Sequence, residues 1–268
     1  MRRGGKSRRW ALIALLAPST ALLAGCSSEN LPALGFPRGV TDINDLSLSL
    51  WQGAWVSAFI VGAFTAVLIL WAALRYRVKR KVGTVDSGAP EKLPEQVSYH
   101  LPLEIIYTVI PFIIVAVLFY FTARDQSTIT KISPAGVAVH EIDVNGIQWA
   151  WQFTYPEAED KTVTGTPENL PTLYLPVGER IRINLTASDV VHSIWIPAFM
   201  MQMQALPNIE NKFEFTAKKE GTYPGFCNMH CGRNHSQMRF TVKVVSPAEY
   251  QSYINKLKGG VEIGRAHV

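Results

Sequence analysis

Acidic residues are missing from the first 28 positions of this chain, although the chain as a whole is basic. It has 268 residues, with 26 Lys plus Arg against 21 Asp plus Glu and a formal charge of +5. Five of the cations lie within the first nine residues, and removing them leaves 21 basic and 21 acidic side chains. The remainder is therefore neutral, which excludes the extended basic surface that nucleic-acid binding requires.

Cysteine is also scarce, and the first of the three, Cys26, follows a secretory leader. The leader has a basic start, an apolar run from Trp10 to Leu23 and a small-residue cleavage region. Its end, Leu23-Ala24-Gly25-Cys26, resembles the bacterial lipobox. We therefore expect a lipoprotein signal peptide over residues 1–25 and acylation of Cys26. An ordinary signal sequence and a retained membrane anchor are the alternatives.

No charged residue lies between Leu46 and Leu74, a run of 29 residues. A bilayer core about 30 Å thick needs about 20 residues of helix. A second uncharged run, from Ile105 to Ala123, has 19 residues and contains Pro111, which membrane helices tolerate. We predict a two-helix transmembrane hairpin over residues 46–125, and the absence of charge argues against two buried helices of a soluble protein.

The connection between these helices, at about residues 75–100, is positively charged. It carries six Lys or Arg residues against three Asp or Glu residues. Because positive loops stay in the cytoplasm, we expect residues 26–45 and the region after the second helix to lie outside it. The prediction is a multi-pass protein of the bacterial cell membrane.

Residues 126–246 change to short segments of alternating polarity separated by turn residues. The clearest of these are 137–144, 172–175, 180–185, 212–215 and 238–245. Such spacing predicts an all-β sandwich or barrel. A short helix or tail is expected at 247–261, whereas 262–268 read as a translated sequencing adapter that is foreign to the fold.

Soft metal donors gather between Cys227 and Met238. This segment holds two thiols, an imidazole at His235 and a thioether, and His192 supplies another imidazole upstream. In a cupredoxin-like sandwich, a His near the end of one strand meets such a Cys-to-Met loop before the last strand. The donor set favours copper, whereas hard cations would need the carboxylates that this segment lacks.

Two cysteines exceed what a single copper ion needs. A mononuclear blue copper site uses one Cys, two His and a weak axial Met. Two thiolates can instead bridge two copper ions, an arrangement suited to fast one-electron transfer. A disulfide between Cys227 and Cys231, and a zinc site, are the alternatives.

From Leu46 to Val245 the chain resembles subunit II of haem–copper cytochrome c oxidases, which bears the binuclear copper A centre. The resemblance rests on Ser-Asp-Val-x-His-Ser at 188–193 and Cys-x3-Cys-Gly-x2-His-Ser-x-Met at 227–238. It implies two copper ions and six ligands: the bridging thiolates of Cys227 and Cys231, the imidazoles of His192 and His235, the axial thioether of Met238, and the backbone carbonyl of Met229.

The same resemblance implies roles for residues outside the ligand set. Trp149 occupies the position where the electron arrives, although a strand tryptophan often serves only core packing. Glu104 resembles the carboxylate at the mouth of a proton path, although it could merely end a helix among lipid headgroups. Met229 stands where the family usually has a Glu that reaches a magnesium ion, and His230 has no counterpart role.

The resemblance implies a subunit of a proton-translocating cytochrome c oxidase, with no oxygen-reducing site in this chain. Its expected partners are oxidase subunit I and the other oxidase subunits, the lipid bilayer and cytochrome c, which is soluble, membrane-tethered or part of a supercomplex. Three other classes of protein are alternatives to this function. A quinol oxidase subunit II generally lacks these ligands, and a free-standing copper carrier needs no helix pair. The third alternative is a structural lipoprotein with a disulfide.

Overall fold

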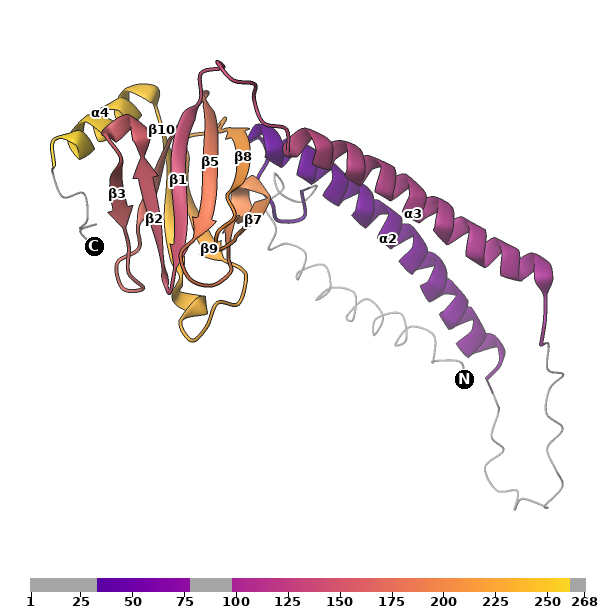
Figure 1. The fold of residues 1–268 in the computed structure, drawn as a ribbon. Helices are drawn as coiled ribbons and strands as arrows, with labels where there is room; N and C mark the ends of the chain where they lie inside the picture. The colour runs from indigo at the N-terminus through magenta and orange to yellow at the C-terminus, as the bar shows by residue number, and fades with distance from the viewer. Residues whose placement is uncertain (1–32, 78–97, 261–268) are drawn as a thin grey trace, which may run out of the picture. The chain divides into compact units, whose positions relative to one another are not determined.

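The structure, a computed structural model, describes residues 33–77 and 98–260 (Figure 1). The predicted signal peptide, Cys26, most of the predicted cytoplasmic connection and residues 262–268 lie outside the described residues. The chain divides into two units, of which one is Leu50–Arg124 and the other comprises the segments before and after it.

Two long helices, α2 (Asp42–Arg75) and α3 (Leu101–Ile129), cover the two charge-free runs. Both are long and apolar enough to cross a bilayer, and none of the residues in their most apolar stretches is buried within the protein. α3 continues through Pro111. The predicted pair of membrane-span-capable helices is therefore confirmed, and lipid is the natural environment for their exposed apolar side chains.

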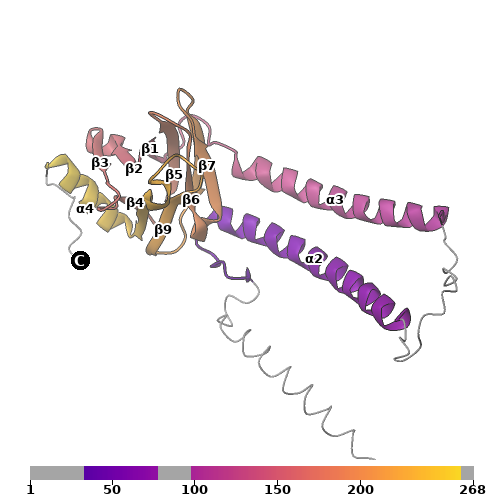
Figure 2. The ribbon, with the colours of Figure 1, turned by 90° about the horizontal axis from the view of Figure 1, so that it is seen from below.

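Ten strands in the other unit form two five-stranded sheets (Figures 1 and 2). The first sheet has the order β3 (Lys161–Thr164), β2 (Ala150–Tyr155), β1 (His140–Ile147), β5 (Arg180–Ala187) and β8 (Asn211–Thr216). The second has the order β4 (Thr172–Pro176), β10 (Arg239–Val245), β9 (Gly221–Cys227), β6 (His192–Ile196) and β7 (Met201–Ala205). The predicted all-β, cupredoxin-like sandwich is confirmed.

Aromatic side chains fill the space between the two sheets. Trp151 and Phe153, both fully buried, project from β2 and meet the ring of Phe240 on β10 at centroid distances of 5.8 and 5.6 Å. Gly225 on β9 lies against this ring, because a Cβ atom there would come within 2.2 Å of it. The close approach of strand and ring therefore requires glycine at this position.

The predicted C-terminal helix is present as α4 (Pro247–Lys258). Ser246 caps it by accepting a hydrogen bond from the backbone N–H of Glu249. Its apolar side chains recur at the spacing of one helix face and are buried against the sandwich: Tyr250, Tyr253, Ile254 and Leu257.

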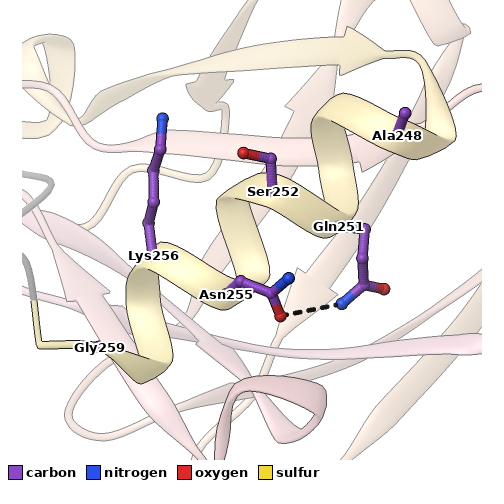
Figure 3. A pocket seen from close by; sticks show the side chains of 6 residues that line it. All are labelled: Ala248, Gln251, Ser252, Asn255, Lys256 and Gly259. Carbon is purple, nitrogen blue, oxygen red and sulfur yellow. Dashed lines mark hydrogen bonds between the residues drawn. The ribbon is translucent and has the colours of Figure 1, made fainter.

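The opposite face of α4 borders a shallow hollow (Figure 3). It is lined by Ala248, Gln251, Ser252, Asn255, Lys256 and Gly259. The amide of Gln251 donates to the side-chain oxygen of Asn255 at 3.3 Å. These side chains include no thiol, imidazole or carboxylate, the groups that usually bind metal ions.

A buried carboxylate, Glu214 on β8, joins the chain segments that lead to and from the membrane helices. It accepts hydrogen bonds from Arg180 at 3.2 Å, from Arg182 at 2.7 Å and from the backbone N–H of Ser133 at 3.1 Å. Arg180 also donates to Asp42, the first residue of α2, at 2.6 Å. The start of α2 and the segment after α3 are thus fixed to β5 and β8.

Candidate metal centre

The segment between β9 and β10 brings most of the predicted donors to one place. β9 ends at Cys227, and the segment passes through the short 3-10 helix η4 (His235–Gln237) before β10 begins. The backbone N–H of Cys227 donates to the carbonyl of Met238 at 3.0 Å, which closes the segment on itself. His192, the first residue of β6, comes from the neighbouring strand of the same sheet.

The two thiols lie at the centre of this group. Their Sγ atoms are 3.9 Å apart, and both cysteines are free, so the predicted alternative of a disulfide is not present in this structure. A disulfide would require about 2.05 Å. Nδ1 of His192 lies 3.9 Å from Sγ of Cys227, and Nδ1 of His235 lies 3.5 Å from Sγ of Cys231.

The weaker predicted ligands approach the same sulfur atoms. Sδ of Met238 is 3.8 Å from Sγ of Cys231. The backbone carbonyl oxygen of Met229 accepts a hydrogen bond from the Cys227 thiol at 3.3 Å. The structure therefore brings all six predicted ligands into one cluster, and the Met229 contact comes from its backbone.

The chemistry of this cluster fits copper. Thiolate, thioether and imidazole are soft or borderline donors, and no carboxylate belongs to the cluster. Cys227, Cys231, His192 and Met238 are all buried, so the donors are shielded from water. A thioether among the donors disfavours zinc, which takes Cys, His and carboxylate ligands.

Asp189 orients His192, a role that sequence reasoning did not assign. Its carboxylate lies 2.8 Å from Nε2 of His192 and also accepts the backbone N–H groups of Val190 at 2.6 Å and Gln148 at 2.7 Å. Because a carboxylate accepts hydrogen bonds, Nε2 carries a proton and Nδ1 is the ring nitrogen that faces Cys227. The only sequence signal was the position of Asp189 within the Ser-Asp-Val-x-His-Ser motif.

The two thiols differ in acidity. Burial raises the pKa of Cys227, but hydrogen bonds with His192 and with backbone groups of Ser193 and Met229 outweigh burial and lower it. Burial, together with the negative charge of Cys227, raises the pKa of Cys231 to about 12. Since metals bind thiolates, an incoming ion must displace the Cys231 proton.

Trp149 lies beside the cluster and is only partly buried. Its indole N–H donates to the carbonyl oxygen of Cys231 at 3.2 Å, and the side-chain amide of Gln148 donates to the same oxygen at 2.8 Å. Trp149 also packs against the hydrophobic core, as the core-packing alternative expects, and Trp151 is fully buried within it. Sequence reasoning did not assign Gln148, whose contact with Cys231 spans 83 residues of chain.

These contacts form a closed ring of five residues, here called the contact ring, in which Gln148 takes part through its backbone N–H as well as its amide, and Cys231 through its backbone carbonyl as well as its thiol. It runs from Asp189 through Gln148, Cys231, Cys227 and His192 back to Asp189. Each member touches two others, so the orientations of the thiols and of His192 depend on one another.

Glu104 belongs to the other unit, in the first turn of α3. Its carboxylate accepts the backbone N–H of His100 at 3.1 Å, and the imidazole of His100 accepts the N–H of Leu103 at 3.3 Å. This reciprocal pattern satisfies two free N–H groups at the helix start. The predicted alternative of a helix-end role thus has direct structural support.

Gly146 on β1 leaves room for the His192 ring, and replacing it with alanine should disturb the site. The added Cβ atom would lie 2.8 Å from Cδ2 of His192, so the ring must shift and its contact with Asp189 weakens. We expect copper affinity to fall about 10- to 100-fold, the usual effect of losing such a supporting contact. Competition with a copper chelator measures this, and Gly62→Ala, with open space around it, is the matched control.

The fold and the site together define a class: a protein with a pair of membrane-span-capable helices and a cupredoxin-like domain that carries a soft-donor site. The family model described as cytochrome c oxidase subunit II, periplasmic domain, matches residues 140–245. The chain belongs to the cytochrome c oxidase subunit II family, which is copper-associated.

Relatives of this family match nearly the whole chain. A probable cytochrome c oxidase subunit 2 of Streptomyces avermitilis is 37% identical, over 92% of this chain and 85% of the relative. A cytochrome c oxidase subunit 2 of Mycobacterium bovis is 30% identical, over 93% and 82% of the two chains. The crystal structure of the periplasmic domain of a Bradyrhizobium japonicum subunit II is 27% identical over 48% of this chain and 99% of that chain, with a TM-score of 0.44.

Proposed function

We propose that this chain is the electron-accepting subunit of a cytochrome c oxidase. It receives electrons from cytochrome c at a binuclear copper centre and delivers them to the haem and copper centres of subunit I, where oxygen is reduced to water with proton translocation. The observation that carries the proposal is the approach of two free, buried thiols to 3.9 Å, with an imidazole near each.

Six residues would hold two copper ions. Cys227 and Cys231 would supply thiolates, His192 and His235 imidazoles, Met238 a thioether, and Met229 its backbone carbonyl. When bound, the copper pair accepts and releases one electron at a time. The surplus of sulfur over the needs of one ion favours two ions.

The chain's own residues prepare this site. Asp189 fixes the proton of His192 on Nε2 and so leaves Nδ1 free for a metal. The thiols give up their protons as a metal binds, and the proton of Cys231 is the harder to remove. The burial of both sulfur atoms excludes water from them.

Electron input is proposed at Trp149. This indole is partly exposed, and its N–H donates directly to the carbonyl of Cys231. An aromatic ring at the surface thus lies one hydrogen bond from a residue that would bridge the metals. Gln148 donates to the same carbonyl and keeps it in place.

Glu104 is proposed to mark the opening of a proton path into subunit I. A carboxylate at the end of an apolar helix is costly to desolvate, and such groups often have functional roles. Its hydrogen bond to His100 is compatible with this role, because a carboxylate that caps a helix can still exchange protons with water.

The placement in the cell follows from the helices and the sequence. We propose removal of residues 1–25, acylation of Cys26, a multi-pass chain in the bacterial cell membrane, and an extracytoplasmic copper domain at 126–246. The proposed partners are subunit I, other oxidase subunits and cytochrome c, either soluble, tethered to the membrane or within a supercomplex.

Electron paramagnetic resonance of the full chain, purified in detergent and loaded with copper, tests this function. We expect hyperfine splitting from one electron shared by two copper ions, and we expect reduced cytochrome c to remove the signal. A single-copper pattern would contradict the binuclear centre. A binuclear signal that reduced cytochrome c leaves unchanged would contradict the role as electron acceptor.

A further inference from the structure

His230 is an exposed imidazole beside the buried donors, and the function proposed above does not use it. It lies between Met229 and Cys231 in the sequence. Its ring meets the ring of His235 edge to face, with the centroids 5.5 Å apart. His235 in turn lies 3.5 Å from the sulfur of Cys231.

The donors pass from exposed at His230 to buried at the thiols and His192. His230 is exposed and His235 is partly buried, whereas Cys231 is 4% exposed and His192 is completely buried. The order inward is His235, Cys231, Cys227 and His192. The sulfur or Nδ1 atoms of successive residues in this order lie 3.5 to 3.9 Å apart. A copper ion arriving from outside can therefore reach the thiols by way of the two surface-facing imidazoles.

We propose that His230 is an acquisition site, where an incoming Cu⁺ ion first binds before it passes to His235 and the buried thiols. The inference rests on the proposed copper centre and adds the route by which that centre is filled. His230 then holds the ion only during loading and is not a ligand of the finished centre.

The chemistry of the surroundings selects a soft monovalent ion. Imidazole binds Cu⁺ well, and thiolates bind it better, so the ion moves inward down a gradient of affinity. Residues 227–238 contain no Asp or Glu, so this segment lacks the carboxylates that hard divalent cations need. Transfer to the sulfur atoms breaks the Cu–N bond to His230, forms Cu–S bonds and releases the thiol protons to water, and the ion stays Cu⁺ with no electron gained or lost.

The rate of Cu⁺ uptake tests the inference. The metal-free full chain, reduced and held in detergent, is mixed with the coloured Cu⁺ complex of bicinchoninate, and the loss of colour reports transfer. We expect His230→Gln to slow transfer about tenfold, the effect of losing one modest contact from the rate-limiting step. After one-electron oxidation of both loaded proteins with ferricyanide, the final copper content and the final resonance signal should match those of the unaltered chain.

Two further variants keep the test specific. Gln237→Ala removes an exposed polar side chain from the same segment and should leave the rate unchanged. His230→Met keeps a soft donor and should restore most of the rate. Equal rates in the unaltered chain and His230→Gln, or equal slowing by Gln237→Ala, would overturn the inference.

The failure of the inference is distinguishable from failure of the proposed function. If the unaltered chain takes up no copper, the copper centre itself is wrong. If His230→Gln loads to a different final copper content or signal, His230 is a permanent ligand and the acquisition role is wrong. If loading is complete and equally fast in both proteins, only the acquisition role fails.

Discussion

Replacing Cys227 or Cys231 with serine is expected to abolish the resonance signature of a binuclear copper centre. A serine hydroxyl is a hard donor that remains protonated near neutral pH, so it cannot replace a bridging thiolate. The two sulfur atoms lie 3.9 Å apart and each has its own imidazole neighbour, so the loss of either thiol removes one half of the bridge. The spectrum of the copper-loaded full chain is the measurement.

Met229→Leu is the control for the two serine variants, because it changes a side chain in the same segment without removing a thiol. Only the carbonyl of Met229 approaches Cys227, and the backbone survives the substitution. We therefore expect this variant to keep most of the binuclear signal. Persistence of that signal in either serine variant would show that the thiols do not bridge the metals, and its loss in Met229→Leu would show that the thioether is a ligand.

Glu214→Gln is expected to lower the free energy of unfolding by about 3–5 kcal/mol, the usual cost of breaking a buried ion pair from one side. The Glu214 side chain is fully buried and accepts from both Arg180 and Arg182. The neutral amide leaves these guanidinium groups without their shared carboxylate. Urea unfolding of the full chain in detergent, followed by tryptophan fluorescence, measures the difference, and Glu168→Gln, at an exposed glutamate, is the control.

The same carboxylate gives the stability a defined dependence on pH. Burial raises the pKa of Glu214, but hydrogen bonds from Ser133 and Arg182 outweigh burial, and the pKa lies below its ordinary value. A group whose pKa is lower in the folded state stabilises the fold above its unfolded pKa and loses that contribution as pH falls through the folded pKa. The stability gap between the unaltered protein and Glu214→Gln should therefore narrow in acid, and a gap that stays constant would contradict this role.

Much of the fold could be predicted because its signals are local. The two helices follow from absence of charge, and strands such as β5 and β10 follow from the alternation of apolar and polar residues over most of their length. β9 was not predicted, because Gly221, Pro224 and Gly225 are typical of turns. It nevertheless pairs with β10 and β6, and packing against Phe240 favours glycine at position 225 over ordinary strand residues.

The predicted boundary between membrane and sandwich differs from the observed one. The charge-free run begins at Leu46, whereas α2 begins at Asp42 and its first turns belong to the sandwich unit. The reason is that Asp42 binds Arg180 and the backbone N–H of Thr216, residues more than 130 positions away. Hydropathy detects the lipid-facing part of a helix, and it does not detect tertiary contacts that extend the helix.

The ligand types could be predicted from the sequence, whereas the residues that hold them could not. Cys227, Cys231, His235 and Met238 are close in the chain, and their chemistry identifies them. Asp189 acts on Gln148 across 41 residues, and no local pattern gives that distance. Supporting contacts of this kind become visible only when the strands are placed.

The contact ring also affects the rate that we expect for the proposed electron transfer, because it limits how far the residues of the site can move. Part of the cost of moving an electron is the rearrangement of the groups around the centre as its charge changes. Asp189 restrains the imidazole of His192 and Gln148 restrains the backbone of Cys231, each through a hydrogen bond, so both residues have little freedom to shift. Donors fixed in advance require little reorganisation when charge arrives. We therefore expect the proposed electron transfer at this site to need little rearrangement of the protein, because folding has already fixed these residues.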